Sequence, residues 1–223
     1  MNLALTSDFP STANQVVVNR MRSTGRCPRV AWIPPFTAMG RTRFPAAQKL
    51  FESYGFSDVE YCDIDEEPNE RQLARLDEYD VVYLTGGDQI GFRRNFLRTG
   101  LPSRLRHRLA VGCLIIGASG GSMQLTRNVS LFRLLTAKFE EVVESRGEYE
   151  ALGVVGNELL PHMNRLEPQF LEAVRCYSEH VAHDVIALAD GAAVLHTSSE
   201  DYKCVGQAVR FRKGIMAPIE GAA

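Results

Sequence analysis

The chain has 223 residues, a formal net charge of −2 at neutral pH, and 45% hydrophobic against 23% charged residues. This composition is ordinary for a globular protein, and the charge gives no electrostatic reason to expect nucleic acid or an anionic membrane as a partner. No apolar stretch approaches the roughly 20 residues that span a bilayer, and the N-terminus does not resemble a signal peptide. Five cysteines without a Cys-x-x-Cys pair favour a reduced, cytoplasmic setting.

Short apolar segments alternate with segments of helical periodicity through the first half of the chain. We predict strands at residues 3–5, 30–33, 59–62, 81–84 and 114–116. We predict helices at residues 11–23, 41–54, 70–76, 90–98, 102–109 and 122–125. Strands separated by helical segments of this length are typical of βαβ units and a parallel sheet.

The last third of the chain changes character. A strand at residues 154–160 and an amphipathic helix at 167–181 precede four short strands, at 185–188, 193–196, 203–205 and 209–211. The close spacing of these strands predicts antiparallel hairpins at one edge of the sheet. Because no linker or repeat interrupts the chain, we predict a single α/β domain over residues 1–223. Its three layers are α/β/α, around a mostly parallel sheet with antiparallel strands near the C-terminal edge.

The most informative motif is Gly-x-Ser-x-Gly at residues 117–121, with Ser119 at its centre. An apolar segment precedes the motif and a helix-capable segment follows it, so Ser119 lies at a turn from strand to helix. A nucleophile elbow has this arrangement, in which glycines allow a tight turn beside the serine. The other interpretation is an ordinary turn whose serine caps the helix.

A nucleophilic serine needs a base to remove its proton and a carboxylate to orient that base. Residues that follow parallel strands meet at one edge of the sheet, and His162 follows the strand at 154–160. We therefore favour His162 as the base over the histidines at 107, 180, 183 and 196. Asp190 follows the strand at 185–188 and is the favoured carboxylate, ahead of Glu158, Glu167 and Asp184.

An oxyanion hole requires two hydrogen-bond donors that point at the developing negative oxygen. The backbone N–H of Gly120, directly after the candidate nucleophile, is one such donor. The Gly86-Gly87 pair, which follows the strand at 81–84, is the natural source of the second donor because glycine permits close approach. The other interpretation of this pair is a plain turn at the end of a strand.

Four segments of the chain occur in an order that resembles the peptidase E (aspartyl dipeptidase) family and its cyanophycinase relatives. These segments are residues 81–88, 115–123, 159–162 and 187–191, and the resemblance extends to about residue 193. It implies a class I glutamine amidotransferase-like fold, with Ser119 as nucleophile, His162 as base and an acid at Asp190. It places the oxyanion donors at Gly87 and Gly120. The implied reaction is metal-free and cofactor-free hydrolysis of a short peptide, such as an Asp-X dipeptide, through an acyl-enzyme.

The chain departs from the family pattern at three positions. Gly120 replaces the usual alanine, Asp88 replaces a common asparagine, and Asp190 replaces the glutamate of aspartyl dipeptidases. The Asp88 carboxylate would oppose an anionic substrate unless it is paired or turned away. We name Asp88 and Arg165 as candidate substrate contacts, since an arginine should bind a substrate aspartate and Arg165 is near His162.

Two other function classes stay open. An esterase of the α/β-hydrolase type also uses this elbow, but its acid precedes its histidine, which here would require His196 with Asp184 or Asp190. A non-catalytic ligand-binding or regulatory protein of the same fold is the second, motivated by Asp88 and Gly120. Amidotransferases of this fold carry a cysteine at the elbow, where this chain has serine. For a peptidase we expect a small peptide substrate, no nucleic acid or membrane partner, and a monomer or homodimer.

Overall fold

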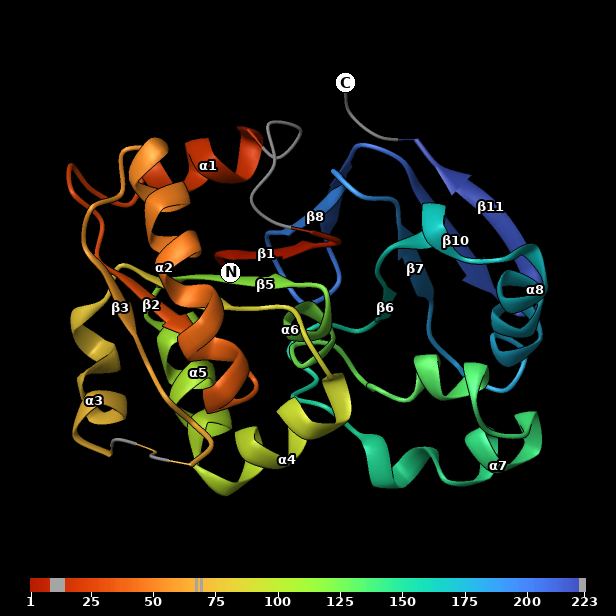
Figure 1. Cartoon of the computed structure of the whole chain (residues 1–223). Coiled ribbons are helices and arrows are strands. Elements are labelled where there is room, and N and C mark those ends of the chain that lie inside the picture. Colours follow the sequence, from red (N-terminus) through yellow and green to blue (C-terminus); the bar gives the residue numbers. More distant parts are fainter. Residues whose placement is uncertain (9–14, 67, 69, 221–223) are drawn as a thin grey trace.

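The computed structural model describes residues 1–8, 15–66, 68 and 70–220 (Figure 1). Seven of its strands form the larger of two sheets: β1 Leu3–Thr6, β2 Val30–Ile33, β3 Val59–Tyr61, β4 Val81–Leu84, β5 Leu114–Ala118, β8 Ala193–His196 and β9 Tyr202–Val205. Their order is β3-β2-β4-β5-β1-β8-β9, with β1 to β5 parallel and β8 and β9 antiparallel. The predicted fold class, a parallel core with an antiparallel C-terminal edge, is confirmed.

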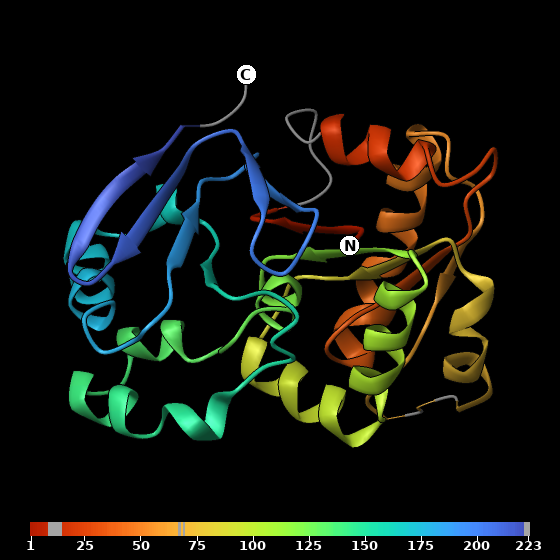
Figure 2. The ribbon, with the colours of Figure 1, turned by 180° about the vertical axis from the view of Figure 1, so that it is seen from behind.

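Helices cover both faces of this larger sheet. Apolar residues of α1 (Gln15–Arg22) and α2 (Thr37–Ser53) pack on one face, while α3 (Glu70–Ala74), α4 (Gln89–Arg98) and α5 (Leu101–Ala110) pack on the other. Figures 1 and 2 show these helices on the two sides of the strands. Residues 11–14 of the predicted first helix lie outside the described residues. No described helix has the length and apolar character needed to cross a membrane.

A second sheet of four strands was not predicted. It contains β6 Glu158–Leu160, β7 Val185–Leu188, β10 Ala208–Arg212 and β11 Ile215–Ile219, in the order β11-β10-β7-β6. β6 and β7 are parallel, whereas β10 pairs antiparallel with both β7 and β11. The close spacing of the late strands predicts that they all lie at one sheet edge, but only β8 and β9 lie at the edge of the larger sheet.

Strand β7 shows why the second sheet packs where it does. Val185 and Ala187 lie in a core cluster with α7 (Phe139–Glu144) and α8 (Pro168–Tyr177). Ile186 and Leu188, on the opposite face of the strand, join the core cluster of the larger sheet. Because successive side chains of a strand point to opposite faces, this fully buried strand ties the two halves together.

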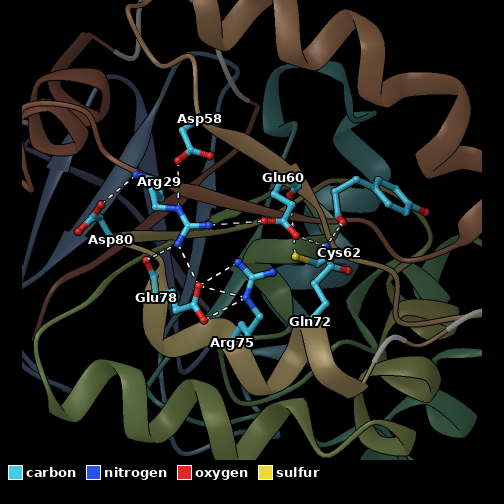
Figure 3. Close-up of polar contacts among 9 residues, drawn as sticks. Arg29, Asp58, Glu60, Cys62, Gln72, Arg75, Glu78 and Asp80 are labelled. Carbon is cyan, nitrogen blue, oxygen red and sulfur yellow. Dashed lines mark hydrogen bonds and ion pairs between the residues drawn. The ribbon is translucent and has the colours of Figure 1, made fainter.

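Arg29, just before β2, links the amino ends of three parallel strands (Figure 3). Its guanidinium nitrogens lie 3.0 Å from Asp58, 3.1 Å from Glu78 and 3.7 Å from Glu60. Its backbone N–H donates to Asp80 at 2.9 Å. These groups are partly exposed, so the network adds little stability and mainly fixes strand ends. It lies at the opposite end of the strands from the candidate site.

Candidate active site

Ser119 lies at a sharp turn between β5 and the short helix α6 (Gly120–Met123). Its backbone has φ +50° and ψ −119°, a conformation that non-glycine residues rarely adopt and that costs about 1–3 kcal/mol. The turn requires glycine at position 121, where a Cβ would lie 2.3 Å from the Leu84 carbonyl oxygen. The strained turn presents a half-buried serine at the carboxyl end of β5, as the elbow motif predicted.

His162 approaches Ser119 from the second sheet. It follows Pro161 at the end of β6, in the left-handed region at φ +61°. Its Nε2 lies 2.8 Å from the Ser119 Oγ, and its Nδ1 lies 2.6 Å from an Asp190 carboxylate oxygen. An ionised carboxylate only accepts hydrogen bonds, so Nδ1 donates to Asp190 and Nε2 is free to accept from the serine hydroxyl.

Asp190 lies in the connection between β7 and β8. Burial raises the pKa of this carboxyl, but hydrogen bonds from His162, Arg165 and Ser7 outweigh that effect and hold the pKa below its ordinary value. Asp190 is therefore ionised at neutral pH and can stabilise a positive charge on the imidazole. The structure thus brings Ser119, His162 and Asp190 into one continuous hydrogen-bonded chain.

Sequence reasoning missed three residues that hold this chain in place. Ser7 is fully buried, donates to Asp190 at 3.1 Å, and accepts from the His162 backbone N–H at 2.8 Å. The Asn164 amide oxygen accepts from the Asp190 backbone N–H at 2.8 Å, and Asp8 accepts from the Gly191 N–H at 2.6 Å. Ser7 and Asp8 follow β1, so the strand-end rule applied to His162 would also have identified them.

The Gly86-Gly87 turn lies directly against the elbow. A Cβ on Gly86 would lie 3.1 Å from the Ser119 Cβ, and a Cβ on Gly120 would lie only 2.3 Å from the Gly87 carbonyl oxygen. Glycine at position 120 therefore follows from the close approach of the two turns. The contact places the backbones of Gly87 and Gly120 beside the Ser119 side chain.

The two candidate substrate contacts already have partners. The Asp88 carboxylate caps α4 by accepting from the Ile90 N–H at 2.9 Å, which explains an acidic residue at the start of this helix. The Arg165 Nε donates to Asp190, while 63% of the Arg165 side chain stays exposed. Both residues lie next to the site, since Asp88 is adjacent to Gly87 and Arg165 contacts the Asp190 carboxylate.

His196, the histidine that an esterase interpretation requires, does not lie near Ser119. It pairs with Leu3 at the amino end of β1, whereas Ser119 follows the carboxyl end of the neighbouring parallel strand β5. The His196 ring is fully buried, and neither ring nitrogen has a hydrogen-bond partner among the described residues. The described residues also contain no group of three or more metal-ligating side chains suited to a metal ion.

A serine on a strand–helix elbow, with an imidazole in contact with its hydroxyl, is the arrangement of a serine-type hydrolase. A comparison with models of protein families identifies one family within this class of hydrolases. The model of peptidase family S51 matches residues 5–203, so the chain belongs to this family. It is a serine-type peptidase of the peptidase E group, which confirms the resemblance in the sequence.

Individual relatives agree with this assignment. The chain is 28% identical over 165 residues to "Uncharacterized peptidase Lmo0363" of Listeria monocytogenes, covering 73% of this chain and 78% of that protein. It is 34% identical over 90 residues to "Peptidase E" of Streptomyces coelicolor, covering 40% of this chain and 35% of that protein.

Two crystal structures share the fold. One is a candidate peptidase E of Listeria monocytogenes, with a TM-score of 0.67, 22% identity and 98% coverage of both chains. The other is a peptidase of an acI-B1 Actinobacterium, with a TM-score of 0.76, 14% identity, and coverage of 99% of this chain and 94% of that one.

Proposed function

We propose that the chain hydrolyses short peptides through an acyl-enzyme, with Ser119, His162 and Asp190 as a catalytic triad. The observation that carries this proposal is the unbroken contact chain, 2.8 Å from Ser119 Oγ to His162 Nε2 and 2.6 Å from His162 Nδ1 to Asp190. Both distances are within hydrogen-bond reach, so the base can take the serine proton without rearrangement.

In this mechanism the Ser119 oxygen attacks the scissile carbonyl carbon while His162 Nε2 takes the hydroxyl proton. Asp190 stabilises the resulting imidazolium. We assign the backbone N–H groups of Gly87 and Gly120 as donors to the tetrahedral oxyanion. The intermediate collapses as His162 returns the proton to the leaving amine. Water then attacks the acyl-enzyme with His162 again as base, which releases the acid and restores the serine.

The finer substrate assignment is also a proposal. Arg165 holds Asp190 through Nε only, so its remaining N–H groups can bind a substrate carboxylate, as an Asp-X dipeptide would require. Asp88 is exposed beside Gly87, and only one of its oxygens caps α4. We assign the other oxygen to the free amino group of a dipeptide, which carries the opposite charge.

We also propose a single domain and a cytoplasmic setting. A core cluster with residues from both sheets, among them Leu5 and Ile186, supports one domain over residues 1–223. All five cysteines are unpaired, which supports a reducing, cytoplasmic setting. The absence of metal or cofactor, the absence of nucleic acid and membrane partners, and a monomeric or homodimeric state are predictions still to be measured.

The test combines a peptide-library cleavage assay with labelling by a fluorophosphonate probe. Wild type should cleave short peptides and be labelled at Ser119. Ser119→Ala should neither cleave the peptides nor react with the probe. His162→Ala should lower both rates by several orders of magnitude, and His196→Ala should retain a measurable rate. Full-rate cleavage by Ser119→Ala would eliminate the proposal. Loss of activity in His196→Ala with activity retained in His162→Ala would favour an esterase of the other type.

A further inference from the structure

A polar cavity lies away from the proposed triad, at the amino ends of the two strands that lead to His162 and Asp190. The carboxyl ends of β6 and β7 lead to His162 and Asp190, while their amino ends begin with Glu158 and, just before β7, His183. Even a fully extended chain from Glu158 to His162 would span only about 13 Å. The cavity at the amino ends has a volume of about 510 Å³.

Arginines dominate the walls of this cavity. Arg106 from α5, Arg127 from the segment after α6, and Arg146 line it together with His180 and His183. The lining contains a single carboxylate, that of Glu150, which has no ion-pair partner in the described part of the chain.

Each arginine is anchored through only part of its guanidinium. Arg106 Nη2 donates to the Leu152 carbonyl at 2.7 Å, and Arg127 Nε donates to the Gly156 carbonyl at 2.8 Å. Neither has a carboxylate within ion-pair distance among the described residues. Since a guanidinium carries five N–H donors, each keeps several donors for another acceptor while its position is fixed by the backbone.

The third arginine, Arg146, contacts the buried carboxylate of Glu158. Arg146 Nη2 and His183 Nε2 each lie 2.8 Å from the same oxygen of Glu158, a residue with no exposed surface, and Tyr177 donates to the other oxygen at 3.0 Å. This network holds Arg146 and His183 at the cavity wall. Arg146 Nη1 and His183 Nδ1 have no hydrogen-bond partner among the described residues.

We propose that this cavity binds a small oxyanion with at least two negative charges, the chemistry shared by phosphate esters and polycarboxylates. Fixed guanidinium groups with free N–H donors suit such a ligand, because forked donors bind oxyanions in pairs. A single carboxylate would leave part of this donor set unused. The neighbouring cavity of about 430 Å³ shares Arg127 and His183. It adds the carboxylates of Asp184 and Glu200 as well as Arg210 and Arg212, so its charge is mixed.

The test is isothermal titration of the full chain with pyrophosphate and, separately, with citrate, in low-salt buffer. Saturable binding of one ion per chain is expected, and the tighter of the two ions identifies the ligand type. Arg127→Gln and Arg106→Gln should each weaken binding about 10-fold or more, because each removes charge-assisted hydrogen bonds. Glu150→Gln should strengthen binding severalfold, since it removes the only carboxylate of the lining.

Two controls separate this site from general charge effects and from the triad. Arg104→Gln removes the same charge from α5 outside the cavity lining and should bind like wild type. Arg165→Gln, beside Asp190, should also retain binding. The proposal is overturned if neither ion binds saturably, if Arg104→Gln weakens binding as much as Arg127→Gln, or if Arg165→Gln abolishes it.

Discussion

Removal of the Ser7 hydroxyl tests whether the proposed triad depends on a residue outside it. Ser7 lies just beyond β1 in the larger sheet, and it contacts His162 and Asp190 next to the second sheet. Ser7→Ala deletes one oxygen atom and leaves the fold otherwise intact. The Asp190 carboxylate then loses one donor, and the His162 backbone N–H loses its acceptor.

The magnitude follows from these two bonds. A hydrogen bond to a charged group contributes about 1.5–3 kcal/mol, and a buried N–H left without an acceptor costs about 1–3 kcal/mol. Ser7 has no exposed surface, so water does not readily replace the lost hydroxyl. The two effects together should lower the free energy of unfolding by about 2.5–6 kcal/mol. We expect the reaction rate of Ser119 to fall about 10- to 100-fold, because the imidazole is held less firmly.

The pH dependence distinguishes positioning from simple destabilisation. Ser7 is one of the donors that lower the pKa of Asp190, so its removal raises that pKa. An Asp190 carboxyl with a higher pKa is protonated at a higher pH, so the loss of labelling that this protonation causes should begin at a higher pH than in wild type. The assay is the second-order rate of fluorophosphonate labelling as a function of pH, which requires no knowledge of the natural substrate.

Ser122→Ala is the matched control for this experiment. The Ser122 hydroxyl is also fully buried and also bridges two groups, since it donates to the Thr6 carbonyl at 2.8 Å and accepts from the Thr6 N–H at 3.0 Å. It contacts neither His162 nor Asp190. Ser122→Ala should lose similar stability without moving the acid side of the profile. An unchanged rate and profile in Ser7→Ala would refute the positioning role.

Two further predictions concern His196 and Gly120. Burial lowers the pKa of His196 from 6.5 to about 4, so between these values the unfolded chain binds a proton that the folded chain does not. Stability should be intact above pH 6.5 and fall by up to about 3 kcal/mol towards pH 4. Urea unfolding of wild type and His196→Leu against pH measures this, and parallel curves would contradict it. Gly120→Ala should force its Cβ against the Gly87 oxygen and lower the labelling rate about 100-fold or more by displacing a proposed oxyanion donor. A wild-type rate would show that Gly87 does not serve as a donor.

The strands most predictable from sequence are almost entirely buried apolar segments. β2, β4, β7 and β8 match their predicted bounds because turn-forming or polar residues lie within two positions of each end of the segment. β6 begins four residues later than predicted. Before Glu158, the backbone N–H of Val154 bonds to Leu125 and that of Gly156 to Ser199, so these residues form loop contacts. The apolar residues before Glu158 therefore reflect the burial of this segment and do not indicate an extended strand.

Other errors have a similar physical origin. The helix predicted to reach residue 181 ends at Tyr177, and the N–H of His180 bonds to the Tyr177 carbonyl in a turn. Val181 is nevertheless buried, so the apolar periodicity continues past the helix. β11 was missed because it is largely exposed and contains Pro218. It forms through a turn at Lys213 and Gly214, both with positive φ, that pairs it with β10.

The candidate triad was predictable for a reason that is only partly right. The strand-end rule brought Ser119, His162 and Asp190 together by assuming one sheet. In the structure the rule applies to each sheet separately. Ser119 follows a strand of the larger sheet, whereas His162 and Asp190 follow β6 and β7, two adjacent parallel strands of the second sheet. Which sheet a late strand joins depends on long-range packing that a local sequence pattern does not encode.

The connection between the sheets has a consequence for catalysis. β7 and β8 belong to different sheets, only residues 189–192 join them, and Asp190 lies in this short connection. The Ser7 N–H donates to the Ala192 carbonyl at 3.2 Å, and Asp8 accepts from Gly191 at 2.6 Å. These bonds extend the antiparallel β1–β8 pairing of the larger sheet, so they anchor the connection that carries the Asp190 carboxylate to that sheet. A relative shift of the sheets by about 1 Å would lengthen the serine–imidazole contact beyond a productive distance. The reaction rate of Ser119 should therefore depend on how firmly the two sheets pack against each other.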